Sequence, residues 1–270
     1  MSNVITLASV QPPQCLNDFA LQPTSRYRLE SIIDQTLAFP DNGVCGLLFH
    51  GLHGTGKTTI ANLMPGLIET SRTTGALSNC PPGDLVDTTG ALYDFHPCAS
   101  GQNGAALIQS IQNKTSFIAF NSSNLHFLIL DEIDNLTDLA QASLKAIMNR
   151  TNVVFIMTTN HLHKVDLGIQ NRSVIVDMNM PPPACWRPIL ARVFTRSGLT
   201  PPSDQVLDQT VVAGRGSARS IFSDVVLSAN RRIRNGESAN DAPVAASKGE
   251  RRSARLQDAK SPSDTQPRGD

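Results

Sequence analysis

The sequence predicts an α/β fold, in which a parallel sheet flanked by helices is followed by a small α-helical domain. Four short apolar runs bounded by turn residues have the composition of buried parallel strands, and helical patterns alternate with them. From about residue 183 onward the pattern is helical only. Strands that alternate with helices indicate a parallel sheet, and the later change of pattern indicates a second unit.

Each element is predicted from its own local pattern. The expected strands cover residues 44–50, 125–130, 153–160 and 173–179, all rich in Val, Ile, Leu or Phe. Apolar residues at spacings of three and four, together with Ser or Asp at several starts, predict helices. These helices cover residues 25–40, 57–69, 104–114, 136–150, 186–198, 203–214 and 217–230. The Gly-, Thr- and Pro-rich residues 70–90 are expected to form a surface excursion with little regular structure.

Four segments follow from these patterns. We expect a flexible N-terminal arm over residues 1–15, the α/β domain over 16–182, the helical domain over 183–230, and a disordered tail over 231–270. The tail has few large apolar side chains and carries nine Lys plus Arg against six Asp plus Glu. Such a composition cannot bury enough apolar surface to offset the chain entropy lost on folding.

Bulk composition excludes several classes of protein. Lys plus Arg and Asp plus Glu both number 23 in the 270 residues, which argues against a globally basic nucleic-acid-binding protein. No apolar run approaches the roughly 20 residues needed to span a bilayer, and the first residues lack the pattern of a signal peptide. The five scattered cysteines include no CxxC pair, so a disulfide framework is not expected. The sequence therefore predicts a cytoplasmic protein with no membrane partner.

A phosphate-binding motif follows the first expected strand. The stretch "GLHGTGKTT" fits G-x-x-x-x-G-K-[ST] and lies between a strand and a helix, the context that this motif requires. Its backbone N–H groups can surround phosphate oxygens, Lys57 can reach the β- and γ-phosphates, and the Thr58 hydroxyl can bind Mg²⁺. The expected cofactors are therefore ATP and Mg²⁺. The expected binding residues are Gly51, Leu52, His53, Gly54, Thr55, Gly56, Lys57, Thr58 and Thr59.

An acidic pair follows the second strand in "LHFLILDEID". In open α/β sheets, ligands bind at the carboxyl ends of the strands, so these carboxylates are expected beside the phosphate-binding loop. Asp131 would then hold Mg²⁺ directly or through water, and Glu132 would polarise the attacking water. A carboxylate in that role favours an ATP-hydrolysing enzyme over a small-molecule kinase.

The order of these motifs with "TTN", "IQNRS" and "GSARSI" resembles AAA+ P-loop ATPases, and among them the clamp-loader clade. This clade comprises replication factor C small subunits and bacterial clamp-loader ATPase subunits. The resemblance extends from about Leu16 to about Asn230. "LNDFALQ" is similar to the family's lead-in segment, and "DNLTDLAQASLKAIMNR" is similar to its "DxMTxxAQxALRRxME" segment.

The resemblance implies further roles for three residues. Asn160 would be sensor 1, an amide that helps to position the attacking water. Arg172 in "IQNRS" would be an arginine finger that projects into the ATP site of a neighbouring subunit. Arg219 in "GSARSI" would be sensor 2, which binds the phosphates from the helical domain, the lid of this family. The implied catalytic residues are thus Glu132, Asn160 and Arg172.

The sequence also departs from the family pattern. Ser173 replaces the usual Cys, and Cys98 and Gly101 replace the Asn and Asp of "NASD". The expected lid ends near residue 230, so the collar domain of clamp-loader subunits is expected to be lacking.

Three functions remain open. The first is an oligomeric ATPase that acts on primer–template or duplex DNA in replication or repair, with other AAA+ subunits and a sliding clamp as partners. Its phosphate contacts would include the helix that carries Lys145 and Arg150. The second is a Holliday-junction-type DNA motor. The third is a protein remodeller or regulator without direct DNA contact.

Overall fold

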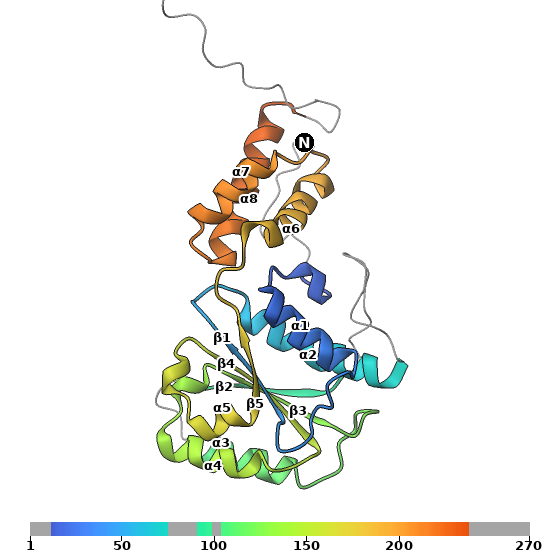
Figure 1. Cartoon of the computed structure of the whole chain (residues 1–270), viewed down its shortest axis with the longest axis vertical. Helices are drawn as coiled ribbons and strands as arrows, with labels where there is room; N and C mark the ends of the chain where they lie inside the picture. The colour runs from blue at the N-terminus through green and yellow to red at the C-terminus, as the bar shows by residue number, and fades with distance from the viewer. Residues whose placement is uncertain (1–11, 75–90, 99–103, 238–270) are drawn as a thin grey trace, which may run out of the picture.

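The computed structural model describes residues 12–74, 91–98 and 104–237. They form a five-stranded sheet in the order β2-β3-β4-β1-β5, and every neighbouring pair is parallel (Figure 1). The predicted α/β class with a parallel sheet is therefore confirmed. The strands are β1 (Gly46–His50), β2 (Tyr93–Pro97), β3 (His126–Asp131), β4 (Val153–Thr159) and β5 (Ser173–Asp177).

Helices cover both faces of this sheet. Alternate residues along the strands face opposite sides, so Leu47 and Phe49 of β1 pack with α1 and α2, whereas Leu48 packs with α3, α4 and α5. The result is three layers with an apolar core on each side of the sheet. These helices are α1 (Pro23–Ile33), α2 (Lys57–Thr74), α3 (Gly104–Lys114), α4 (Asp138–Ile147) and α5 (Leu167–Asn171).

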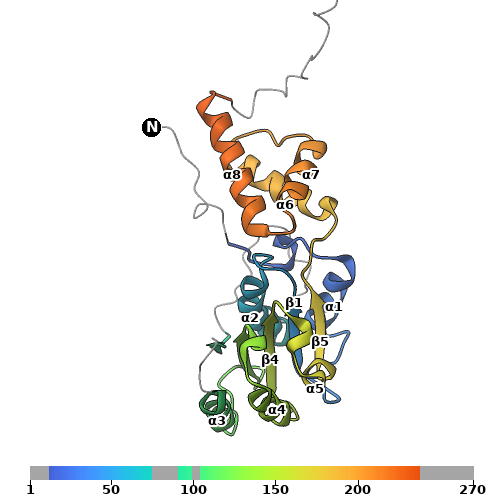
Figure 2. The ribbon, with the colours of Figure 1, turned by 90° about the vertical axis from the view of Figure 1, so that its left-hand side faces the viewer.

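Three further helices form a separate cluster beyond the carboxyl ends of the strands (Figures 1 and 2). They are α6 (Pro183–Arg196), α7 (Asp204–Ala213) and α8 (Ala218–Arg234). Their core contains the fully buried Leu190, Val211 and Ile221 together with Trp186. α8 continues through residues 231–234, which the sequence pattern assigned to the tail. We call this cluster the lid.

Several sequence expectations differ from the structure in detail. β2 was missed because it is an edge strand whose Tyr93 and Phe95 are exposed, so it lacks the apolar run of a central strand. The first helix ends at Ile33 rather than near residue 40. The helix expected over residues 136–150 covers only Asp138–Ile147, and Leu139 in its first turn is 78% exposed.

Some expectations fall on parts of the chain that the structure does not describe. These are residues 1–11 of the N-terminal arm, residues 75–90 of the expected surface excursion, Gly101, and residues 238–270 of the tail. Within the described residues, no helix is both long and apolar enough to cross a membrane.

Candidate functional site

The phosphate-binding loop connects the interior strand β1 to α2. Gly54 and Gly56 adopt φ angles of 77° and 95°, a region that residues with a Cβ rarely occupy. A Cβ on Gly54 would also lie 2.7 Å from Oγ of Ser217, because the lid approaches the loop at this point. The two glycines thus provide the turn and the close contact with the lid.

Lys57 is buried at the first position of α2, with 7% of its surface exposed. Its ammonium group donates to the carbonyl oxygens of Gly51 at 2.9 Å and Leu52 at 2.7 Å. Burial lowers the pKa of Lys57, and the nearby carboxylates of Asp131, Glu132 and Asp134 oppose that shift. The ammonium group therefore lies within the loop, near three acidic residues at and just after the carboxyl end of β3.

Asp131 lies at the carboxyl end of β3 and joins the loop to the neighbouring strand. Its Oδ1 accepts hydrogen bonds from Oγ1 of Thr58 at 2.9 Å and from Oγ1 of Thr158 at 2.7 Å. A carboxylate and a hydroxyl are hard oxygen ligands of the kind that Mg²⁺ prefers. The residues present therefore fit a magnesium ion held by Thr58 and Asp131, directly or through water.

Glu132 and Asn160 meet at the same edge of the sheet. Nδ2 of Asn160 donates to Oε1 of Glu132 at 3.4 Å, and Nδ2 of Asn135 donates to Oε2 at 3.2 Å. The Glu132 side chain is exposed and lines the cavity with Asn160 and Thr158. Its backbone has φ 58° and ψ 52°, the left-handed region that non-glycine residues seldom adopt. A carboxylate and an amide thus face the space beside the loop.

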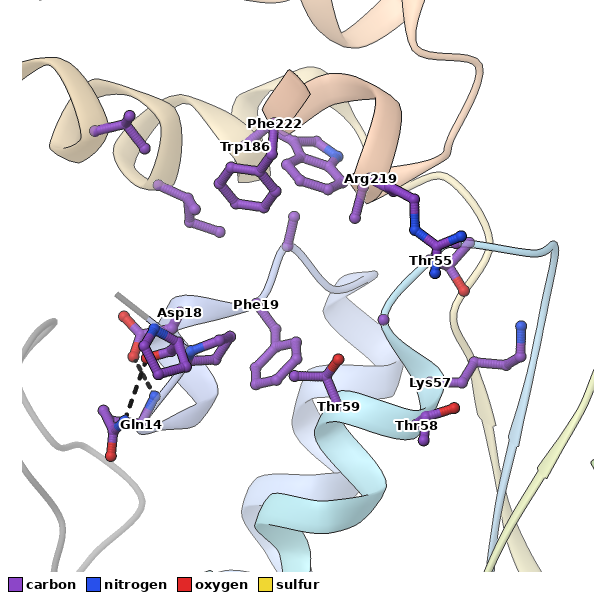
Figure 3. Close-up of a pocket in the computed structure, with 18 of the residues that line it drawn as sticks. Gln14, Asp18, Phe19, Thr55, Lys57, Thr58, Thr59, Trp186, Arg219 and Phe222 are labelled. Atoms are coloured by element: carbon purple, nitrogen blue, oxygen red, sulfur yellow. Dashed lines mark hydrogen bonds between the residues drawn. The ribbon is translucent and has the colours of Figure 1, made fainter. Parts of the chain in front are cut away.

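A cavity of about 1070 Å³ lies between the loop, the N-terminal segment and the lid. Its loop side is lined by Thr55, Lys57, Thr58 and Thr59, and Phe19 lies beside Thr59 (Figure 3). Its lid side carries the rings of Trp186 and Phe222, whose centroids are 6.2 Å apart in an edge-to-face arrangement. The cavity therefore has a polar end at the loop and an aromatic end between Phe19 and the lid, a combination that suits a nucleotide.

Arg219 is exposed at the start of α8, and its side chain extends toward Thr55 in the close-up view (Figure 3). Its backbone N–H donates to the carbonyl of Gly54 at 3.3 Å. The first turn of α8 is thus fixed to the loop by a backbone bond, while the guanidinium group remains at the cavity.

The N-terminal segment contacts the lid through an ion pair. Arg192 of α6 donates to Oδ1 of Asp18, and the backbone N–H groups of Gln14 and Cys15 donate to Oδ2 at 2.8 and 3.2 Å. Burial alone would raise the pKa of Asp18, but the bonds from Gln14, Arg192 and Cys15 outweigh it and lower that pKa. Asp18 therefore links the cavity's N-terminal wall to the lid.

Arg172 lies at the amino ends of the strands, on the side of the sheet away from the phosphate-binding loop. It caps the end of α5 immediately before β5, whereas the loop follows the carboxyl end of β1. Its guanidinium group donates to the carbonyl of Gly168 at 3.0 Å and to Oδ1 of Asn149 at 3.2 Å. The structure therefore does not bring Arg172 to the cavity of its own chain.

The structure gathers the other predicted site residues around the cavity or its loop. The predicted residues that line the cavity are His53, Gly54, Thr55, Gly56, Lys57, Thr58, Thr59, Glu132, Asn160 and Arg219. Three further predicted residues contact these: Gly51, Leu52 and Asp131. Sequence reasoning missed Thr158, Asn135 and the lid aromatics. Thr158 had a local signal, since it lies two residues before Asn160 in the motif "TTN".

The two cations expected to contact phosphates are engaged within the chain. Nζ of Lys145 lies 3.2 Å from Oδ2 of Asp166. Nη1 of Arg150 donates to Oγ1 of Thr115 at 2.6 Å, and Arg150 lies beyond the end of α4. In the described conformation these side chains therefore bind the protein itself.

Comparison with known proteins defines the class. Residues 47–176 match the family model described as ATPase family associated with various cellular activities (AAA). The chain is 26% identical over 178 residues to the replication factor C small subunit of Sulfolobus acidocaldarius, covering 65% of this chain and 48% of that protein. The chain thus spans about half the length of this curated relative.

Solved structures show the same fold. The RuvB Holliday junction branch migration motor of Thermotoga maritima superposes with a TM-score of 0.54 at 15% identity, covering 82% of this chain and 72% of that chain. A variant of that RuvB gives a TM-score of 0.55 at 14% identity, with the same coverage. At this identity the likeness concerns the fold alone.

The parallel sheet and the phosphate-binding loop together define a P-loop α/β fold. Within that class, residues 47–176 match the AAA family model, and the chain resembles the replication factor C small subunit in sequence. The AAA+ recognition made from the motifs is therefore confirmed.

Proposed function

We propose that this protein binds and hydrolyses ATP in the cavity below the lid, as a clamp-loader-like AAA+ ATPase that acts on DNA in replication or repair. The observation that carries the proposal is the continuous set of contacts from Thr58 to Asp131, together with the Glu132–Asn160 pair beside it. These groups lie where the terminal phosphate of a nucleotide bound in the loop would be.

Each residue has a definite part in the proposed reaction. The loop N–H groups and Lys57 bind the phosphates, and Arg219 approaches them from the lid. Thr58 and Asp131 hold Mg²⁺, which neutralises charge on the phosphate oxygens when bound. Glu132 takes a proton from the water that Asn160 orients. The water oxygen bonds to the γ-phosphorus, and the bond from that phosphorus to the bridging oxygen breaks, giving ADP and phosphate.

Arg172 is proposed to act on a neighbouring subunit. Its position at the amino end of β5 separates it from the cavity of its own chain, which supports a role at the nucleotide of another chain. Positive charge there would stabilise the transition state, so hydrolysis would require assembly. The bonds to Gly168 and Asn149 would have to be released or shared when the guanidinium group turns outward.

The proposed partners are other AAA+ subunits, primer–template or duplex DNA and a sliding clamp. Sequence similarity to a replication factor C small subunit supports this choice. We further propose a cytoplasmic location, an α/β domain over residues 16–182, and a lid that begins at residue 183.

The decisive experiment measures the ATPase rate of the purified protein with and without primer–template DNA, alongside its size in solution with ATP. Stimulation by DNA together with ATP-dependent assembly is the expected result. Hydrolysis that is indifferent to DNA would favour the remodeller or regulator instead. No hydrolysis under any of these conditions, with or without DNA, would contradict the proposed function.

A further inference from the structure

Two consecutive hydroxyl groups at the end of β4 bind the turn that follows β3. Oγ1 of Thr158 donates to Oδ1 of Asp131 at 2.7 Å, and Oγ1 of Thr159 donates to Oδ1 of Asp134 at 2.8 Å. Both threonines are buried, with 1% and 0% of their surface exposed. These bonds fix the aspartates on either side of the pair Glu132–Ile133.

Each hydroxyl group also accepts a backbone hydrogen bond. The N–H of Glu132 donates to Oγ1 of Thr158 at 2.9 Å, and the N–H of His161 donates to Oγ1 of Thr159 at 2.9 Å. A hydroxyl group that accepts from one neighbour and donates to another has a defined rotor orientation. Thr158 therefore holds the Asp131 carboxylate and the Glu132 backbone with one oxygen atom.

The Glu132 backbone needs such support. Its left-handed conformation, with φ 58° and ψ 52°, is unfavourable for a residue with a Cβ and persists where surrounding contacts hold it. This conformation turns the chain from β3 into the short 3₁₀ turn Ile133–Asn135. The direction of the Glu132 side chain therefore depends on the bond that its N–H makes to Thr158.

We propose that Thr158 is a positioning residue for hydrolysis, which keeps Asp131 and Glu132 in their working orientations, with Thr159 holding the far end of the same turn through Asp134. This inference rests on the proposed ATPase function. Thr158 touches neither the water nor the phosphate in this scheme and acts through the two carboxylates. A purely space-filling role is the competing explanation, and valine would satisfy it because valine and threonine have nearly the same shape.

The test compares Thr158→Val with Thr158→Ser, and Thr210→Val serves as a matched control. The Thr210 hydroxyl bonds to its own helix α7 on the exposed side of the lid. We expect Thr158→Val to lower kcat about 10- to 100-fold, as for other residues that orient catalytic groups, while Thr158→Ser keeps most of the activity. The affinity for a fluorescent ATP analogue with Mg²⁺ should change far less than kcat.

A second measurement does not depend on activity. Amide hydrogen exchange at Glu132 should accelerate in Thr158→Val and stay slow in Thr158→Ser, because only serine retains an acceptor for that N–H. Wild-type kcat and wild-type exchange in Thr158→Val would overturn the inference. Should Thr158→Val fail to fold, Thr158→Ala provides the same comparison, with the same losses expected.

The two proposals fail in different ways. A wild-type protein that never hydrolyses ATP would remove the proposed function, and the exchange measurement would still test whether Thr158 holds the turn. A wild-type protein that hydrolyses ATP, with a Thr158→Val variant that matches it, would remove only the positioning role.

Discussion

The side-chain amide of Asn160 donates to Oε1 of Glu132 across 3.4 Å, so the residue after β4 contacts the residue after β3 at the cavity. Because β3 and β4 are parallel neighbours, their carboxyl ends meet at one edge of the sheet. One water molecule beside this pair could give a proton to the carboxylate and accept a bond from the amide. The pair therefore has the composition of a site that activates water.

Glu132→Gln should abolish most turnover while leaving nucleotide binding intact. Glutamine keeps the size of the side chain but cannot accept a proton, and loss of a general base typically costs about 10²- to 10⁴-fold in rate. Steady-state ATPase rates and binding of a fluorescent ATP analogue measure the two effects. Glu30→Gln on α1 is the matched control and should behave as wild type. Full activity in Glu132→Gln would rule out this residue as the base.

Arg172→Ala should be inactive alone and should recover activity when mixed with an inactive Lys57→Ala protein. In a mixed assembly, some interfaces pair an intact phosphate-binding loop with an intact Arg172 from the neighbouring chain. Loss of an arginine finger costs about 10³- to 10⁵-fold in kcat, so even a small recovery would be visible. The ATPase rate across a series of mixing ratios is the measurement. A flat, inactive series would contradict action between subunits.

Local sequence patterns predicted the parts of the site whose residues are contiguous in the chain. The strand, loop and helix around Lys57 are contiguous, so their composition sufficed to place them. Asp131 was placed by the rule that ligands of open α/β sheets bind at the carboxyl ends of the strands, whereas Asn160 was implied by the resemblance of "TTN" to the family motif. β2 was missed because exposure of Tyr93 and Phe95 removes the apolar run that marks a central strand.

Those patterns could not predict contacts between segments that are distant in the sequence. The role of Thr158 depends on which strand lies next to β4 and on the left-handed turn at Glu132, and neither is visible in "TTN" alone. The aromatic end of the cavity joins Phe19 of the N-terminal segment to Trp186 and Phe222 of the lid. Such long-range packing depends on how the lid sits over the sheet, which periodicity does not specify.

The single tryptophan of the chain should report nucleotide binding. Trp186 lines the cavity beside Phe222, so a bound base would change the surroundings of its indole ring. Adding ATP and Mg²⁺ should therefore shift or quench the intrinsic tryptophan emission in a saturable manner. The Lys57→Ala variant should need a much higher nucleotide concentration for the same change, because it lacks the phosphate-binding cation. An emission spectrum that stays constant at saturating nucleotide would contradict this location for the base.

The Asp18–Arg192 pair should stabilise the protein at neutral pH and lose that effect in acid. The folded-state pKa of Asp18 is lowered below the ordinary value of 3.8, because the bonds from Gln14, Arg192 and Cys15 outweigh the opposing effect of burial. A depressed pKa means that the stabilisation is fully present above the unfolded-state pKa. It disappears as the pH falls from about 4 through the lower folded-state value.

Asp18→Asn removes the charge and keeps the shape, so it should reduce the free energy of unfolding at pH 7 by about 1 to 2 kcal/mol, the usual difference between charged and neutral hydrogen bonds. Urea unfolding of the wild type and the variant between pH 7 and pH 3 provides the measurement. The difference in the free energy of unfolding between the wild type and Asp18→Asn should stay constant down to about pH 5 and shrink below pH 4. Asp224→Asn, at an exposed position of α8, is the control and should change little at any pH. If this difference in the free energy of unfolding grew as the pH fell, the inferences that the pKa of Asp18 is lowered and that its ion pair is stabilising would both be wrong.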